Sequence, residues 1–243
     1  MVTPIEGLGT PEALWRAWPQ PTTWPRLDLA AVKHVVVVAP HPDDEVLGIG
    51  GLLSLLGQAE VIAVTDGEAS HPGSTVYTPT ALAALRRDET RAALAALGLK
   101  STVHHLGQPD GRIDETALVE EIVDRLTPDS WCLTTWRGDG HPDHEAVGRA
   151  AATACARTGA RLLEYPVWTW HWAVPDDPRV PWEQARRIDL PPTTAAAKRS
   201  ATNEFVSQLH PIGPAPADRP VLPAHVLDRL LRDWEVVLDD PGA

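Results

Sequence analysis

Cysteine is scarce in this 243-residue chain, which contains only Cys132 and Cys155. Two cysteines are too few for the disulfide framework of a small secreted domain, and no Cys-x-x-Cys pair is present to form a metal knuckle. We therefore expect free thiols in a reducing compartment and a cytoplasmic location. The first 20 residues contain no basic segment followed by an apolar one, so they are not expected to act as a signal peptide.

Basic residues are also in short supply, since 21 Lys and Arg are set against 33 Asp and Glu, which gives a formal net charge of −12. A chain this acidic is poorly suited to neutralise the phosphates of DNA or RNA or to bind an anionic membrane surface. No apolar run approaches the roughly 20 residues needed to cross a bilayer. We therefore expect no nucleic acid partner and no membrane insertion, and we expect a small molecule as the substrate or ligand.

Hydrophobic residues make up 43% of the chain, which is enough for the core of one good-sized α/β domain. Apolar, β-branched segments alternate with helical patterns. The expected strands are 35–39, 60–65, 102–106, 130–135 and 161–165, and the expected helices are 44–56, 81–97, 116–126 and 145–157. This alternation predicts a three-layer α/β/α, Rossmann-like fold with a mostly parallel sheet in a single domain. In such sheets, ligand sites lie beyond the carboxyl ends of the strands.

The two ends of the chain have less regular patterns. Residues 1–30 are rich in proline and tryptophan, and we expect an N-terminal extension that either wraps on the domain through Trp15, Trp18 and Trp24 or is loosely ordered. Residues 31–243 are expected to form the single domain. In its last third, the pattern predicts a strand at 184–190 and helices at 193–209 and 224–235.

Two short segments resemble each other and occupy equivalent places in the expected fold. The first is HPDDE at residues 41–45, and the second is HPDHE at residues 141–145. Each follows an expected strand and begins an expected helix, so both should face the same crevice. Together they would gather three histidines and three aspartates, namely His41, His141, His144, Asp43, Asp44 and Asp143.

Such a set of side chains suits a divalent metal, because imidazole and carboxylate are good zinc ligands and a catalytic zinc keeps three protein ligands and one position for water. His41 and Asp44 can reach one ion from a single turn, and His144 can supply the third ligand. Asp43 and His141 would then lie beside the ion, in positions for a proton acceptor and a charge stabiliser. The alternative is a pair of ordinary helix caps, since Asp before a helix and Pro at its first position are common. The occurrence of two such segments at equivalent places favours the metal.

The segment APHPDDE at residues 39–45, with HPDH at 141–144, resembles the PIG-L/LmbE-like family of zinc-dependent de-N-acetylases of N-acetylglucosamine-containing compounds. Other matching motifs follow in order: TDGE at 65–68, Arg86 and Glu89 followed by Leu97-Gly98, and LGQPDG at 106–111. The resemblance covers about residues 35–165 and extends more weakly to Lys198 and residues 207–208. It implies a zinc amidohydrolase, with residues 31–243 as a deacetylase-like catalytic domain.

The resemblance also implies roles for single residues. The ligands of zinc, or of another divalent metal, would be His41, Asp44 and His144. Asp43 would be the general base, a protonated His141 would stabilise the oxyanion, and Asp143 would orient His141. Either Asp43 or His141 would return the proton to the leaving amine.

Arg86 and Asp110 would contact the amino-sugar-type substrate, according to the same resemblance. From the residues alone, Arg86 belongs to a solvated ion-pair face of a helix, and Asp110 begins a turn with Gly111. The resemblance favours substrate contact at both positions.

Trp168, Trp170 and Trp172 alternate at period two, so one face of an extended segment would present all three rings. They would line a cleft, pack in the core, or form a subunit interface in a homo-oligomer.

Two alternative functions remain open from the residues alone. The first keeps the metal but changes the bond to an ester or phosphoester, and release of phosphate instead of amine would identify it. The second is a metal-binding module without turnover. Asp43 and His141 argue against this module, because a protein that only binds a metal has no need of a base.

Overall fold

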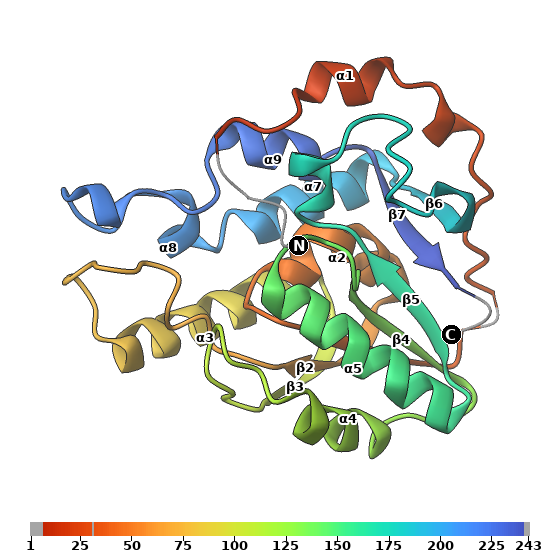
Figure 1. Cartoon of the computed structure of the whole chain (residues 1–243), viewed down its shortest axis with the longest axis horizontal. Helices are drawn as coiled ribbons and strands as arrows, with labels where there is room; N and C mark the ends of the chain where they lie inside the picture. Colours follow the sequence, from red (N-terminus) through yellow and green to blue (C-terminus); the bar gives the residue numbers. More distant parts are fainter. Residues whose placement is uncertain (1–6, 31, 241–243) are drawn as a thin grey trace.

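The computed structural model describes residues 7–30 and 32–240, and within them it contains one seven-stranded sheet with the strand order β3-β2-β1-β4-β5-β7-β6 (Figure 1). The strands are β1 (His34–Ala39), β2 (Gln58–Ala63), β3 (Lys100–His105), β4 (Ser130–Thr135), β5 (Arg161–Tyr165), β6 (Ala185–Asp189) and β7 (Trp234–Asp239). The run from β3 to β5 is parallel, whereas β7 is antiparallel to both β5 and β6. The expected α/β fold with a mostly parallel sheet is therefore confirmed.

Helices cover both faces of the sheet and make the expected three layers (Figure 1). On one face, α2 (Asp44–Leu56) and α3 (Pro79–Ala96) pack against α7 (Pro192–Thr202), and on the other face α4 (Glu115–Val123) packs against α5 (Pro142–Thr158). The shorter helices are α1 (Glu12–Ala17), α6 (Thr169–Trp172), α8 (Val206–Leu209) and α9 (Ala224–Leu230).

The valine run of β1 shows how the sequence specifies two buried faces. Val35 and Val37 belong to one hydrophobic cluster, and Val36 and Val38 belong to the other. Successive side chains of a strand point to opposite faces, so a continuous apolar run supplies both cores at once. A strand buried in this way holds its carboxyl end, where the first HPD segment begins, in a fixed position.

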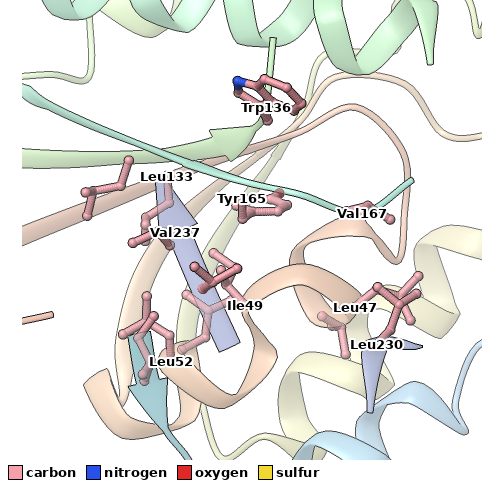
Figure 2. Close-up of a cluster of buried hydrophobic side chains, with 14 of the residues drawn as sticks. Leu47, Ile49, Leu52, Leu133, Trp136, Tyr165, Val167, Leu230 and Val237 are labelled. Atoms are coloured by element: carbon pink, nitrogen blue, oxygen red, sulfur yellow. The ribbon is translucent and has the colours of Figure 1, made fainter. Parts of the chain in front are cut away.

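Helix α2 is anchored tightly because it begins at that first HPD segment. Leu47, Ile49 and Leu52 of α2 pack into the core beside Tyr165 of β5 (Figure 2). A Cβ at Gly48 would lie 2.2 Å from the ring of Tyr165, so only glycine allows this close approach.

The backbone of α2 departs from helical geometry at Ile49, and a buried ion pair supports it there. The carboxylate of Glu235, on β7, accepts hydrogen bonds from the N–H groups of Gly51 and Leu52, both at 2.7 Å. The ammonium of Lys198 lies 2.7 Å from the same carboxylate and balances its charge. The last strand of the sheet therefore stabilises the helix that carries Asp44.

The described part of the N-terminal extension, residues 7–30, packs against the domain. Trp15, Trp18 and Trp24 are buried, and their rings contact three tryptophans of the domain, which are Trp170, Trp182 and Trp234. The ring centroids of Trp15 and Trp170 are 5.0 Å apart, and those of Trp18 and Trp182 are 5.1 Å apart. Edge-to-face contacts of this kind add to the stabilisation from burial of the rings. Residues 1–6 of the expected extension lie outside the described residues.

Three expectations for the last third of the chain were wrong. The helix expected at 224–235 ends at Leu230, and the segment from Trp234 is strand β7, where Val236 and Val237 pair in the sheet. The helix expected at 193–209 is two helices, because the chain turns after Thr202 and buries Phe205 completely. The tryptophan segment is not extended, since α6 includes Trp170 and Trp172; Trp170 is buried in the core and Trp168 lines the cavity described below.

Candidate metal centre and active site

The first HPD segment forms a strained turn between β1 and α2. Asp43 precedes the helix with φ 126° and ψ −31°, a conformation that residues other than glycine rarely adopt and that costs about 1–3 kcal/mol. Its N–H donates to the carboxylate of Glu45 at 3.3 Å. Strain of this size is held only where the surrounding packing fixes the turn, as the buried β1 and α2 do here.

The second HPD segment forms a regular helix start between β4 and α5. His141 is the N-cap of α5, and its Nδ1 accepts a hydrogen bond from the N–H of Asp143 at 3.2 Å. Pro142 takes the first helical position, where proline is favoured. His144 therefore lies in the first turn of the helix, and it is completely buried.

The structure brings these two segments together. Oδ2 of Asp44 lies 3.2 Å from Nδ1 of His41 and 3.2 Å from Nε2 of His144. The ring centroid of His141 is 5.0 Å from that of His41 and 4.8 Å from that of His144. Side chains from positions about one hundred residues apart therefore form one cluster at the carboxyl ends of β1 and β4.

More than one set of metal ligands can be drawn from this cluster. One nitrogen from each of His41, His141 and His144 can be chosen so that all three lie within 4.8 Å of one another, and His41 forms a similar group with oxygens of Asp110 and Asp143. His141 is therefore close enough to His41 and His144 to share an ion with them.

The two ring nitrogens of His144 have different surroundings, and these show whether a metal fits the site. Its Nδ1 lies 2.8 Å from Oδ2 of Asp139. A carboxylate only accepts hydrogen bonds, so the proton of the neutral ring is on Nδ1. The buried Nε2 makes no hydrogen bond with the described residues, although it lies close to the Asp44 carboxylate. In the neutral ring, Nε2 has a buried lone pair beside a carboxylate oxygen, which is what a zinc ligand set requires, so these residues fit the ion.

The cluster is strongly acidic, and this also fits a cation. Burial lowers the pKa of His41, but contacts with Asp110, Asp143 and Asp44 outweigh burial and hold that pKa well above its ordinary value. Burial likewise lowers the pKa of His144, but the charges of Asp44 and Asp139 raise it to about 9. Without a metal, the carboxylates are therefore neutralised by protons on the two rings. A divalent cation would replace these protons.

Asp43 has the protonation properties of a base at neutral pH. Burial raises its pKa and the guanidinium of Arg86 opposes this, with the result that the pKa is about 7. General bases work best when their pKa lies near the operating pH.

His141 differs from the protonated ring that we expected. Burial and the neighbouring His144 and His41 lower its pKa to about 4, so at pH 7 the ring is neutral. Because Nδ1 accepts the N–H of Asp143, the single ring proton is on Nε2. His141 remains a hydrogen-bond donor, but not a cation.

Arg86, on α3, is almost completely buried and lies against the first HPD segment. Its guanidinium donates to the carbonyl of Pro42 at 2.5 Å, to Oδ2 of Asp43 at 3.0 Å and to the carbonyl of Gly67 at 3.0 Å. A Cβ at Gly67 would lie 1.7 Å from this guanidinium, which explains the glycine of the TDGE motif. Arg86 also lines the cavity, so it can contact both Asp43 and a bound molecule.

Asp143 and Asp110 both contact His41. Oδ2 of Asp143 lies 3.0 Å from Nε2 of His41 and accepts the N–H of Gly111 at 2.8 Å. The hydrogen bond to His141 comes from the backbone of Asp143, so the orienting role expected of its carboxylate has no hydrogen bond to support it in the described residues. Asp110 accepts the N–H of Ala69 at 3.1 Å and lines the cavity.

A cavity of about 230 Å³ lies beside this cluster. Its polar wall includes His41, Asp43 and Arg86, and its apolar wall includes Leu47 and Trp168. A larger cavity of about 410 Å³ adjoins it, because both cavities are lined by Ala69 and Asp110.

Sequence reasoning missed Asp139, and it named Glu89 and Gln208 as motif matches without giving them a role. Asp139 is an acid in the loop between β4 and the HPDH motif, and that position was the available signal. Gln208 lines the cavity, and Glu89 supports it by accepting the N–H and hydroxyl of Ser207 at 2.7 and 2.8 Å. The Arg-x-x-Glu motif therefore places Arg86 against Asp43 and Glu89 against Ser207, next to Gln208 in the cavity wall.

Comparison with known proteins finds similarity to de-N-acetylases and other deacetylases. The family model described as "PIG-L: GlcNAc-PI de-N-acetylase" matches residues 36–155. The "Uncharacterized deacetylase YaiS" of Escherichia coli (strain K12) is 30% identical over 146 residues, which cover 55% of this chain and 73% of that protein. The "Probable N-acetyl-alpha-D-glucosaminyl L-malate deacetylase 2" of Bacillus subtilis (strain 168) is 31% identical over 140 residues, which cover 51% of this chain and 62% of that protein. The matches span between 60% and 62% of the length of the Bacillus relatives.

A solved structure shares the fold over most of the chain. The structure titled "deacetylase-bog complex in biosynthesis pathway of teicoplanin" has a TM-score of 0.61 and 18% identity, and the match covers 87% of this chain and 100% of that chain. Similarity at this identity shows the fold alone. In the part of the chain that the structure describes, no helix has both the length and the apolar character needed to cross a membrane.

Proposed function

Because the chain belongs to the PIG-L family of de-N-acetylases, we propose that it is a zinc-dependent amidohydrolase that removes an N-acetyl group from an N-acetylglucosamine-type compound. The observation that carries this proposal is that His41 and His144 both lie against the carboxylate of Asp44, and that the buried Nε2 of His144 makes no hydrogen bond with the described residues. A carboxyl group with a pKa of about 7, Asp43, lies beside them. A metal-binding module without turnover would need the cluster of metal ligands but not the carboxyl group of Asp43.

The cation would be held by His41, Asp44 and His144, and when bound it would supply Lewis-acid activation of water at neutral pH. Asp43 accepts the proton that the water gives up, since about half of its carboxyl groups are ionised at a pH equal to its pKa. Arg86 holds this carboxylate at 3.0 Å and fixes the direction from which it acts.

The Nε2–H of His141 donates a hydrogen bond to the oxyanion that forms when the amide carbonyl is attacked. A donor placed in this way is commonly worth about 3 kcal/mol to the transition state. Because the ring is neutral, it stabilises the oxyanion by a hydrogen bond and not by a full charge. Asp43 carries the proton that the leaving amine requires, since His141 at a pKa of about 4 has no second proton to give at pH 7.

The substrate proposed is a conjugate and not a free sugar. The cavity of about 230 Å³ suits one N-acetylated sugar ring, and the adjoining cavity of about 410 Å³ offers room for a second group. Arg86 and Asp110 would contact the sugar between them. A cytoplasmic location belongs to the same proposal and is supported by the two free, buried thiols.

The decisive experiment measures metal content and amine release together. The purified chain, loaded with zinc, is incubated with N-acetylglucosamine and with a panel of its conjugates, and the free amine is quantified by derivatisation. We expect about one zinc per chain and amine release from at least one conjugate, with activity lost after chelation and restored by zinc. Stoichiometric zinc with no amine release from any panel member would contradict the proposal. Phosphate release from phosphoester analogues would show that the metal acts on a different bond.

A further inference from the structure

Asp139 is completely buried, and both oxygens of its carboxylate accept hydrogen bonds. Its Oδ1 accepts the N–H groups of Val167 and Thr169 and the hydroxyl of Thr169, at 2.9, 2.9 and 2.6 Å. Its Oδ2 accepts the N–H of Trp168 at 2.9 Å and lies 2.8 Å from Nδ1 of His144. Its carbonyl accepts the indole N–H of Trp172 at 2.7 Å.

These bonds link two parts of the site. One is His144, whose Nε2 faces the Asp44 carboxylate at 3.2 Å. The other is the turn at residues 167–169, which begins α6 and carries Trp168 in the cavity wall. A single carboxylate therefore holds both the second HPD segment and one wall of the cavity.

We propose that Asp139 is a positioning residue, which fixes the tautomer of His144 so that Nε2 is free for a metal and ties that ring to the turn carrying Trp168. The inference rests on the proposed function only in taking Nε2 of His144 as a metal ligand. A buried carboxylate on the second nitrogen of a ligating imidazole orients the ring and raises its basicity. Among the described residues, Asp139 is the hydrogen-bond partner of Nδ1 of His144.

An Asp139→Asn substitution tests the tautomer directly, because it is nearly isosteric. The amide oxygen can still accept the N–H groups of Val167 and Thr169 at the Oδ1 position. The amide nitrogen then takes the Oδ2 position, where it meets two other donors, the N–H of Trp168 and the Nδ1–H of His144. The ring is driven to carry its proton on Nε2, which the metal must displace.

We expect Asp139→Asn to lower zinc affinity by about 10- to 100-fold, as measured by competition with a chelating dye. Thr169→Val is the matched control, because it removes the 2.6 Å hydroxyl bond to the same carboxylate and leaves His144 untouched. Its zinc affinity should stay within about threefold of the unsubstituted protein. Equal zinc affinities for Asp139→Asn and Thr169→Val would overturn the inference.

A measurement on the unsubstituted protein covers the case in which Asp139→Asn fails to fold. Long-range ¹H–¹⁵N spectra of the zinc-loaded chain report the protonated nitrogen of each histidine ring, and His144 is assigned by the signal lost in His144→Ala. We expect a slowly exchanging proton on Nδ1 of His144. A proton on Nε2 would overturn the inference.

Both readouts are independent of amide hydrolysis. Normal zinc binding with no turnover in the unsubstituted protein would contradict the proposed hydrolase and leave the role of Asp139 intact. Turnover with equal zinc affinities in the two variants would do the reverse.

Discussion

The two HPD segments share three letters, yet they adopt different structures and have different tasks. In the first, Pro42 lies outside the helix and Asp43 takes a strained conformation beside Arg86. In the second, Pro142 is the first helical residue and Asp143 contacts His41 instead of an arginine. The difference teaches that a repeated motif marks equivalent places in a sheet without marking equivalent roles. In the proposed function, the strained copy carries the base and two metal ligands, His41 and Asp44, and the relaxed copy carries the third ligand and the hydrogen-bond donor.

The largest expected effect comes from the residue after each triplet, where Asp44 and His144 meet. His144→Ala should lower zinc affinity by more than about 100-fold and abolish turnover. This loss exceeds the about 10- to 100-fold that follows when a residue that only supports a ligand is removed. Zinc content after dialysis is the measurement. The control is His104→Ala, which should keep its zinc. His104 lies on β3, where its side chain pairs with Glu60 of β2. Full zinc content in His144→Ala would show that His144 of the second HPD segment is not a zinc ligand.

The next comparison is between the two aspartates at the third position. Asp43→Asn should keep zinc and lower kcat by about 100- to 10,000-fold, because the proton acceptor is lost. Asp143→Asn should cost about 10- to 100-fold, because it affects His41 only from outside. Comparable losses in the two variants would show that the triplets share one role after all.

His141 and His41 open the two triplets, and only His41 is proposed as a ligand. His141→Ala should retain zinc and lower kcat by about 100- to 1,000-fold, the usual effect of removing one oxyanion donor. Loss of zinc in His141→Ala would instead make His141 a ligand, which the spacing of the three imidazoles allows.

A smaller effect is expected at Gly67, which gives Arg86 access to the first segment. Gly67→Ala should displace the guanidinium and reduce kcat by about tenfold, in addition to a loss of stability of about 1 kcal/mol from its positive φ. Gly98→Ala is the control, because Gly98 has a similar φ of 70° and a Cβ there would meet nothing within 4 Å. The control should lose stability by a similar amount and keep its kcat; an unchanged kcat in Gly67→Ala would contradict the role of Arg86.

The smallest effect concerns the glutamates that end the two segments. Glu45 is buried, and burial raises its pKa to about 8. The folded state therefore keeps a proton that the unfolded state loses above about pH 4.5, so stability falls as the pH rises from about 5 to 8. Thermal unfolding of the metal-free protein should show a weaker pH dependence in Glu45→Gln, by up to about 1.4 kcal/mol per pH unit. Glu145→Gln should leave the slope unchanged, and equal slopes for both variants would contradict the prediction.

The fold and the meeting of the two segments could be predicted from the sequence because local patterns determine them. A β-branched run such as Val35–Val38 predicts a strand buried on both faces, and strand ends in a parallel sheet share one edge. Strand β7 could not be predicted, because Glu235 follows a helical pattern without interruption and its partners lie far away in the sequence. The neutral state of His141 could not be predicted either, since it depends on burial and on two neighbouring rings. Asp139 was hidden for the same reason, because most of its hydrogen-bond partners come from residues 167–169.

The support of α2 by Glu235 has a consequence for the order in which the molecule can mature. During synthesis, α2 is made long before β7, since α2 ends at Leu56 and β7 begins at Trp234. Its N–H groups at Gly51 and Leu52 find their acceptor only when β7 emerges and inserts between β5 and β6. Pairings between such distant positions form slowly, because the intervening loop must close first. The support of the helix that carries Asp44, a proposed metal ligand, is therefore completed only after β7 has been made.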